Sequence, residues 1–129
     1  LIMSVQTVIS TTNAPAAIGP YSQAIKANGF IFVSGQLPLN PQTGALSDAS
    51  IEEQTALVMK NISAILQEAG SDLSKVVKTT ILVADLGNFS AINDTYGKFF
   101  EKNPPARACF QAAKLPKGAQ IEIEVIAAE

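Results

Sequence analysis

The chain contains no histidine and only one cysteine, Cys109, and these two shortages exclude several classes of enzyme. Without histidine, neither a Ser-His-Asp triad nor a Cys-His pair can form. A single thiol makes no internal disulfide, and no group of cysteines has the spacing of a metal site. Any chemistry must therefore depend on arginine, glutamate, tyrosine, hydroxyl groups, backbone dipoles and water.

Charge is scarce as well. Charged residues make up 16% of the chain, against about 25% in an average soluble protein. So little charge leaves apolar surface uncovered, and we expect another copy of the same chain to cover part of it. The net charge is −2, and no stretch combines lysine and arginine with aromatic residues, so nucleic-acid binding is not supported.

No apolar run approaches the roughly 20 residues of a membrane span, and no signal peptide is visible. We therefore expect a cytoplasmic protein that does not enter membranes. The length of 129 residues predicts one domain over 1–129. Leu1 and Ile2 precede Met3, and we expect these two residues to be an addition to the natural chain.

Hydrophobic periodicity predicts six strands and two helices. We expect strands over 5–10, 21–27, 30–33, 75–84, 106–112 and 120–128, and helices over 50–70 and from about 88 to before 104. Ser50 and Glu53 form a capping box, and Gly70 is a natural helix stop. Asn28-Gly29 predicts a tight hairpin. The run 30–33 is apolar on both faces, which predicts a central strand covered on both sides. It ends at 34–36, where glycine allows either a close backbone approach or a bulge.

The order β-β-β-α-β-α-β-β predicts the fold class. Both helices are amphipathic along one stripe, so they cover one face of a single mixed six-stranded sheet in a two-layer α+β domain. The opposite sheet face also needs a cover. Because charge is scarce, we expect that face to pack against neighbouring subunits.

The stretch 104–124 holds charges inside apolar strands: Arg107 in the first strand, Glu122 and Glu124 in the second. Such charges are costly unless each meets a partner, a ligand or water. Spacing alone favours a structural ion pair or solvated strand faces over a functional site. Alternation places Arg107 and Cys109 on one strand face, and the two glutamates on one face of theirs.

Four other residues allow two interpretations each. Tyr21 suits a buried core phenol and a cleft wall equally, whereas Ser34 more often bonds the backbone at a strand end. Asn93 falls at the edge of the second helix stripe, where a surface residue is favoured over a donor aimed past the helix. Cys109 is better read as a small apolar residue than as a nucleophile, because no base is present to activate it.

Five motifs occur in a fixed order along the chain. They are Asn-Ala-Pro-x-x-Ile-Gly-Pro-Tyr-Ser-Gln-Ala at 13–24, Ser-Gly-Gln-x-Pro at 34–38, Pro-x-Thr-Gly at 41–44, Pro-Ala-Arg at 105–107 and Leu-Pro-Lys-Gly-x-x-Ile-Glu-Ile-Glu-x-Ile-Ala at 115–127. With these motifs the chain resembles the Rid (YjgF-type) family, in particular its reactive intermediate deaminase A branch, from Met3 to Glu129.

The resemblance implies a fold like that of the small trimeric chorismate mutase, in a homotrimer with inward-facing sheets and ligand clefts at the subunit interfaces. It implies hydrolysis of 2-imino or enamine acids, such as 2-aminoacrylate and 2-iminobutyrate, to 2-keto acids and ammonia. Pyridoxal-phosphate-dependent dehydratases release these reactive acids, so the implied role is control of metabolite damage. No cofactor is implied, and no contact with the dehydratase is required.

The resemblance also implies roles for individual residues. Arg107 binds the substrate carboxylate with the backbone amide of Cys109, and Glu122 directs the water. The other matching positions are Tyr21, as a catalytic residue, and Ser34, Gly35 and Asn93, as substrate-binding residues. The short link 101–105 departs from members that carry more residues there, which bears on the cleft rim and on substrate size.

The residue types suit this reaction. A carboxylate fits the planar fork of an arginine, and a carboxylate base accelerates a reaction by about 10²–10⁴-fold, enough for a substrate that hydrolyses readily. We expect the clamp and the water-directing group on adjoining pieces of sheet, which face each other either within a subunit or across an interface. A non-catalytic binder of small keto or amino acids with a regulatory role is the alternative, and a ribonuclease or chaperone-like role is disfavoured.

Overall fold

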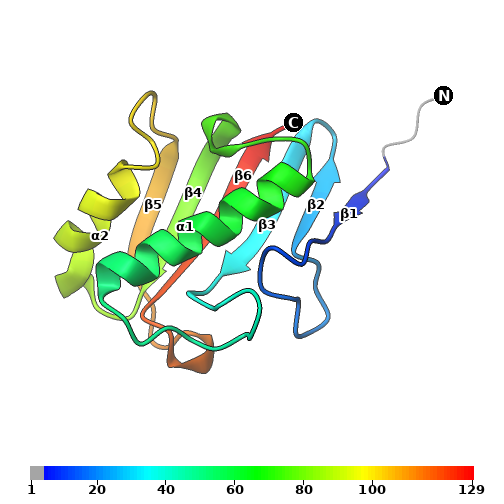
Figure 1. Cartoon of the computed structure of the whole chain (residues 1–129). Coiled ribbons are helices and arrows are strands. Elements are labelled where there is room, and N and C mark those ends of the chain that lie inside the picture. Colours follow the sequence, from blue (N-terminus) through cyan, green and yellow to red (C-terminus); the bar gives the residue numbers. More distant parts are fainter. Residues whose placement is uncertain (1–4) are drawn as a thin grey trace.

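The computed structural model describes residues 5–129, so the expectation for Leu1 and Ile2 lies outside the described residues. The predicted α+β class is confirmed, with six strands in one mixed sheet and two α-helices (Figure 1). The strands are β1 (Thr7–Ile9), β2 (Ala24–Ala27), β3 (Phe30–Gln36), β4 (Val76–Val83), β5 (Ala106–Gln111) and β6 (Ile121–Ala128), and the helices are α1 (Ile51–Glu68) and α2 (Phe89–Gly97).

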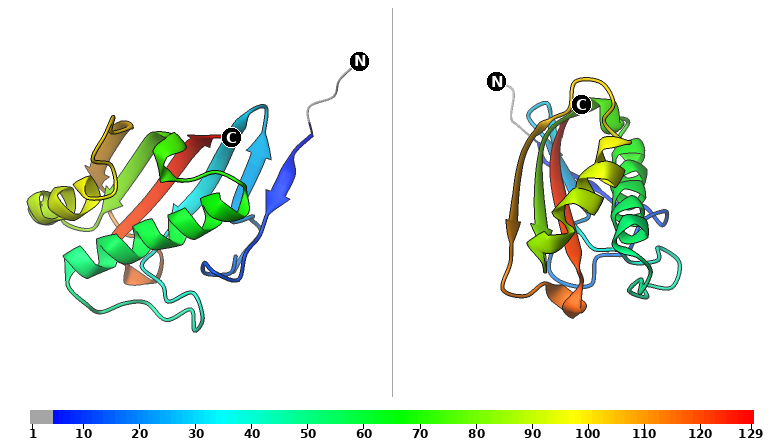
Figure 2. Two further views of the ribbon diagram at one scale, coloured as in Figure 1. Left: turned by 45° about the horizontal axis from the view of Figure 1, so that its top comes forward. Right: turned by 90° about the vertical axis from the view of Figure 1, so that its left-hand side faces the viewer.

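The strands lie in the order β1-β2-β3-β6-β4-β5. Neighbouring strands are antiparallel except for β4 and β5, which run parallel and are joined through α2. The last strand, β6, occupies a central place between β3 and β4, whereas β5 forms an edge. Both helices lie on the same face of the sheet, as predicted, and no helix of the described part of the chain lies on the other face (Figure 2).

Helix α1 begins and ends where the sequence predicts. The hydroxyl of Ser50 accepts a hydrogen bond from the backbone N–H of Glu53 at 3.1 Å, which satisfies one of the free amides of the first turn. The chain leaves the helix at Gly70, whose φ of 82° suits a residue without a Cβ.

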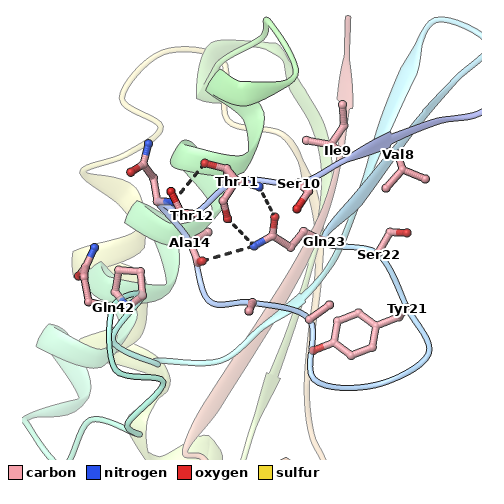
Figure 3. A pocket seen from close by; sticks show the side chains of 14 residues that line it. Val8, Ile9, Ser10, Thr11, Thr12, Ala14, Tyr21, Ser22, Gln23 and Gln42 are labelled. Carbon is pink, nitrogen blue, oxygen red and sulfur yellow. Dashed lines mark hydrogen bonds between the residues drawn. The ribbon is translucent and has the colours of Figure 1, made fainter.

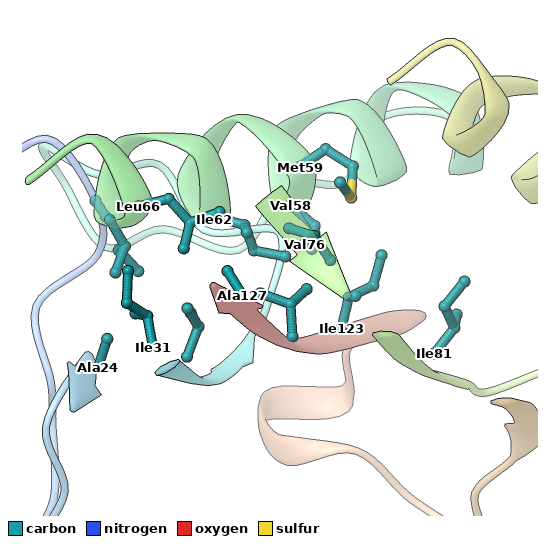
Figure 4. Packing of buried hydrophobic residues seen from close by; sticks show 14 of the residues in the cluster. Ala24, Ile31, Val58, Met59, Ile62, Leu66, Val76, Ile81, Ile123 and Ala127 are labelled. Atoms are coloured by element: carbon teal, nitrogen blue, oxygen red, sulfur yellow. The ribbon is translucent and has the colours of Figure 1, made fainter. Parts of the chain in front are cut away.

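The core lies between α1 and the sheet (Figure 4). The stripe of α1 that faces the strands includes Val58, Met59, Ile62, Ile65 and Leu66, all without exposed surface. Opposite them lie alternate residues of the central strands: Ile31, Ile81, Ile121 and Ile123. Each fully buried aliphatic side chain contributes about 1.5–3 kcal/mol, so this packing fixes the face of the sheet that the helices cover.

In the hairpin of β2 and β3, the turn lies where the sequence predicts it, but β2 begins later than predicted. Asn28 and Gly29 have φ of 52° and 84°, as a type I′ turn requires. Strand β2 begins at Ala24, not at Tyr21 as predicted, because the chain turns just before it, where the Tyr21 N–H donates to the Gly19 carbonyl.

The second face of the sheet is open within one chain. Strand β3 is central and has its predicted irregularity between Val33 and Gln36, but only one of its faces is covered by its own chain. On the other face Phe30 and Phe32 remain 41% and 46% exposed. The open face therefore exposes two aromatic rings beside polar residues. Among residues 5–129, no helix combines the length and the apolar character needed to cross a membrane.

Candidate active site

The sheet register puts Arg107 and Glu122 on opposite faces. Arg107 pairs with Thr79, which is buried under the helices, whereas Glu122 pairs with Leu82 on the open face. The expectation of adjoining pieces of sheet is wrong, because β4 lies between β5 and β6. The reason is topological: the helical connection through α2 puts β5 outside β4, and β6 then returns to the slot beside β3.

Arg107, the only arginine of the chain, is held by α2. Its Nη1 donates a hydrogen bond to Asn93 Oδ1 at 2.7 Å. Its guanidinium carbon lies 5.4 Å from the ring centre of Phe89 and 5.3 Å from that of Tyr96, within the range of cation–π attraction. Asn93 is therefore more than the surface residue that its position favoured, since it accepts a hydrogen bond from the predicted clamp.

Cys109 follows on the same face of β5 and is half-buried. Burial raises the pKa of its thiol, and the nearby charge of Arg107 lowers it by less. The thiol is thus neutral at ordinary pH, in line with its reading as a small apolar residue. Because β5 is an edge strand, its outer row of backbone groups faces away from β4 and is open to a ligand.

A second group of predicted residues meets on the open face. Four segments of the chain (the loop before β2, the end of β3, the turn before β6, and β6 itself) border a hollow of about 420 Å³. It is lined by Tyr21, Ser34, Gly35, Glu122 and Glu124, together with the apolar side chains of Ile18, Leu37 and Pro116. The structure therefore gathers four of the predicted site residues here, and Arg107, Asn93 and Cys109 elsewhere.

The carboxyl of Glu122 is the most perturbed group of this hollow. Half-burial raises its pKa above the ordinary glutamate value, and the neighbouring charge of Glu124 raises it further. Gly35 is the reason why Glu122 fits. A Cβ at position 35 would overlap Glu122 Oε2 and lie 2.9 Å from its Cδ, so only glycine permits this approach.

The two hydroxyl groups of the hollow have defined orientations. Ser34 Oγ donates to the carbonyl of Ser22 at 2.6 Å, so its lone pairs remain to accept from a ligand. The phenol oxygen of Tyr21 accepts from the N–H of Ile18 at 3.3 Å, so its O–H remains to donate. One acceptor and one donor therefore border the space above Glu122.

Gln23 organises the loop that carries Tyr21. It is buried and is one of the residues that line a neighbouring hollow of about 730 Å³ (Figure 3). Its side chain accepts from the Thr11 N–H at 2.7 Å and donates to the carbonyls of Thr11 and Pro15. Sequence reasoning missed this residue, although it lies within the motif at 13–24.

The aromatic residues around Arg107 were also missed. Phe89 and Tyr96 fit the apolar stripe of α2, and nothing in helical periodicity separates a ring that fills the core from a ring that holds a cation. Within residues 5–129, no three histidine, cysteine, aspartate or glutamate side chains gather as a set of metal ligands.

Comparison with known proteins gives consistent matches. The family model described as endoribonuclease L-PSP matches residues 11–129. Reactive Intermediate Deaminase A of the Arabidopsis thaliana chloroplast is 54% identical over 93% of this chain and 64% of its own length. The 2-iminobutanoate/2-iminopropanoate deaminase of Capra hircus is 48% identical over 97% of this chain and 91% of its own. The structure of the Rid-family protein YyfA from Yersinia pestis, of unknown function, superposes with a TM-score of 0.95 at 51% identity, covering 97% of this chain and all of that one (100%).

Proposed function

Because this chain belongs to the Rid (YjgF, endoribonuclease L-PSP) family, we propose that it hydrolyses reactive 2-imino and enamine acids to 2-keto acids and ammonia. The relatives named as deaminases support this substrate class. The observation that carries the proposal is the hollow in which half-buried Glu122, with its raised pKa, meets the hydroxyls of Tyr21 and Ser34. Perturbed carboxyl groups in a cleft mark candidate general bases.

The complete cleft lies between two copies of the chain. Arg107 and Glu122 point away from opposite faces of one sheet, so a cleft that uses both needs a second subunit. The open face offers the surface for that contact, and a closed homotrimer lets every subunit give its Arg107 to one cleft and its Glu122 to another. We therefore propose a homotrimer with three shared sites.

In this cleft Arg107 binds the carboxylate of the imino acid with two parallel hydrogen bonds. The backbone amide of Cys109 supports the same carboxylate, and Asn93 fixes the guanidinium from behind. Ser34 accepts an N–H of the protonated imine. These contacts leave the imine carbon facing the hollow that contains Glu122.

Hydrolysis then needs only a base and an acid. Glu122 takes a proton from water, and the hydroxide adds to the imine carbon to give a carbinolamine. Tyr21 donates a hydrogen bond to the new oxygen, and Glu122 returns the proton to the nitrogen. The C–N bond then breaks while the hydroxyl proton passes through Glu122 to the leaving ammonia, so the products are the keto acid and ammonium. A carboxylate in this role gives about 10²–10⁴-fold in rate, which is sufficient for a labile imine.

The substrates of this reaction arise when pyridoxal-phosphate-dependent dehydratases release enamines from hydroxy amino acids. The proposed role is therefore control of metabolite damage, and it requires no stable complex with the dehydratase. We place it in the cytoplasm, in keeping with a chain whose only thiol cannot close an internal disulfide. Cell fractionation tests this placement.

The direct test couples the protein to threonine dehydratase and follows the decay of 2-iminobutyrate by semicarbazide trapping. The protein should lower the amount of trapped imine in proportion to its concentration, and Glu122→Gln should serve as a folded, inactive control. If the wild-type protein does no better than buffer, the enzymatic proposal fails.

A mixing experiment tests the shared cleft. At low substrate concentration Arg107→Ala should bind too little substrate to act, and Glu122→Gln should lack turnover. Co-expressed subunits should combine an intact arginine with an intact glutamate in some sites. Random assembly puts both intact residues in about a quarter of the sites of a closed ring. No recovery of activity in the mixed oligomers would mean that each cleft takes both residues from one chain.

A regulatory binder without turnover is the second candidate. It is favoured by one observation, the clamp around Arg107, which one chain builds without any help from Glu122. In that case Glu122→Ala would leave keto-acid affinity unchanged, and the wild type would show no turnover to lose.

A further inference from the structure

The contacts of Arg107 go beyond a hydrogen bond to Asn93. Residues 89, 93 and 96 lie on one face of α2, so the helix presents a ring, an amide and a second ring to the guanidinium. An exposed arginine side chain has many rotamers, and each of these contacts restricts them. The direction in which the remaining N–H groups point is therefore set by α2.

The two rings differ in how firmly they are held. Phe89 is 37% exposed at the start of α2, whereas Tyr96 is 5% exposed. The ring of Tyr96 also packs against Phe100, with 5.0 Å between the ring centres. Tyr96 is thus the fixed member of the pair.

The hydroxyl of Tyr96 has a specific partner in the sheet. Thr79 Oγ1 lies 2.7 Å from Tyr96 Oη, and both side chains are buried. Thr79 has no exposed surface and shares its face of β4 with the apolar Ile81 and Val83. A hydroxyl at such a position is costly unless it is hydrogen-bonded, so Thr79 and Tyr96 satisfy each other.

Thr79 is also the register partner of Arg107 on the neighbouring strand. Thr79, the neighbour of Arg107 in the sheet, therefore shares a hydrogen bond with the hydroxyl of Tyr96, whose ring lies beside the guanidinium. Burial raises the pKa of Tyr96, which keeps the phenol neutral and able to share this hydrogen bond.

We propose that Tyr96, anchored by Thr79, is a positioning residue that sets the direction of the Arg107 guanidinium. The inference deepens the proposed function, since it rests on Arg107 as the carboxylate clamp. Tyr96 and Thr79 act through Arg107 and not on the reacting atoms. Losing the anchor should therefore weaken carboxylate binding and leave the chemical step unchanged, because Glu122 lies on the other face of the sheet.

The test uses Tyr96→Phe and Thr79→Val, which remove the hydrogen bond but keep the ring and the approximate volume. Both should raise the KM for 2-iminobutyrate and the Kd for 2-oxobutyrate by about 3- to 10-fold, with kcat unchanged. The double variant should be no weaker than the single ones, because each of them already breaks the same bond.

Two control variants separate positioning from general stability. Thr79→Ser keeps the hydroxyl and should restore the affinity. Thr55→Val removes a buried hydroxyl that donates to the Ile51 carbonyl at 2.7 Å in α1, far from Arg107 in the sequence and on another helix. It should lower thermal stability to a similar degree as Thr79→Val without changing KM or Kd.

An independent readout comes from NMR. Arg107 is the only arginine, so the spectrum contains one guanidinium Nε–Hε resonance and needs no assignment. Ring currents should shift this resonance in the wild type, and Tyr96→Phe and Thr79→Val should move or broaden it, while Thr55→Val should not.

The possible outcomes separate the two proposals. Unchanged resonance and unchanged Kd in both variants would make Tyr96 an ordinary core residue and overturn the inference. A fall in kcat with unchanged Kd would overturn it too. If the resonance moves but the wild type neither binds 2-oxobutyrate nor hydrolyses the imine, Tyr96 still positions Arg107, and the proposed function is what fails.

Discussion

Arg107 and Glu122 receive different support from their own chain. The guanidinium has a hydrogen bond to Asn93 and two aromatic rings beside it, which together orient it. The carboxyl of Glu122 sits half-buried above Gly35, and both burial and the charge of Glu124 oppose its ionisation. One chain thus holds a well-oriented guanidinium on one face of the sheet and, on the other face, a carboxyl whose pKa is raised.

This difference separates binding from chemistry. A cation whose orientation is fixed by its neighbours is suited to hold an anion without itself reacting. A carboxyl whose pKa is raised is suited to move protons. Changes around Arg107 should therefore appear in KM, and changes around Glu122 should appear in kcat.

The largest effect is expected for Glu122→Gln, which keeps the shape of the side chain but removes the base. The turnover number should fall by about 10²–10⁴-fold, while the Kd for 2-oxobutyrate should change little. Stopped-flow imine decay and calorimetric titration measure the two quantities. If the Kd for 2-oxobutyrate rises by the same factor as kcat falls, binding and chemistry are not separated between the two faces of the sheet.

The same variant has a pH signature in stability. A folded-state pKa above the unfolded one means that the folded chain holds more protons between the two values, so the stability from this group is present at low pH and is lost as pH rises through the folded pKa. Replacing Glu122 by glutamine should therefore reduce the dependence of the free energy of unfolding on pH between these two pKa values. Urea unfolding of wild type and Glu122→Gln across the acidic range measures it.

The next effect is expected for Gly35→Ala. The added Cβ would overlap the Glu122 carboxylate and force it aside, and a displacement of about 1 Å can cost up to 10²-fold in rate. We expect a fall of roughly 10- to 100-fold in kcat with keto-acid affinity retained.

Gly97→Ala provides the matched control. A Cβ there meets nothing within 4 Å, and the replacement removes a glycine from α2, so it should raise stability by about 0.5–1 kcal/mol and leave kcat unchanged. Equal losses of activity in the two variants would argue against steric displacement of Glu122.

Much of this fold follows from local sequence rules. Ser50, Gly70 and the Asn28-Gly29 pair fix where a helix starts, where it ends and where a hairpin turns, because each acts on neighbouring backbone. The strand order does not follow, since β6 pairs with β3 and β4, and these pairings depend on long-range packing. That is why the two charged strands were expected side by side.

The site shows the same limit. Alternation assigns Arg107 and Cys109 to one face of β5. It cannot tell whether Glu122 on β6 lies on the same face of the sheet or on the opposite one. Only the shared register with β4 supplies that link. The motifs therefore identify the candidate site residues, but only the sheet topology shows that Arg107 and Glu122 lie on opposite faces.

A moderate effect on binding is expected for Arg107→Lys. The charge remains, but lysine lacks the planar fork and cannot make two parallel hydrogen bonds to a carboxylate. Loss of one charge-assisted bond should weaken 2-oxobutyrate binding by about tenfold, with a smaller change in kcat. Calorimetry against 2-oxobutyrate measures it, and an unchanged Kd would rule out bidentate binding.

The smallest effect is expected for Glu124→Gln. Glu122 must be ionised to accept a proton, so the acid limb of kcat/KM should lie above the ordinary glutamate pKa of about 4.3. The charge of Glu124 is the lesser of the two causes that raise the pKa of Glu122, and its removal should move the limb to lower pH by a fraction of a unit, because burial remains. The pH profile of imine hydrolysis measures this shift, and Glu122→Gln, which lacks the base, should show no such limb in its residual activity. If the acid limb stays in place in Glu124→Gln, burial alone raises the pKa of Glu122. If the limb moves to higher pH, Glu124 instead lowers the pKa of Glu122 in the assembled protein, through contacts with the second subunit.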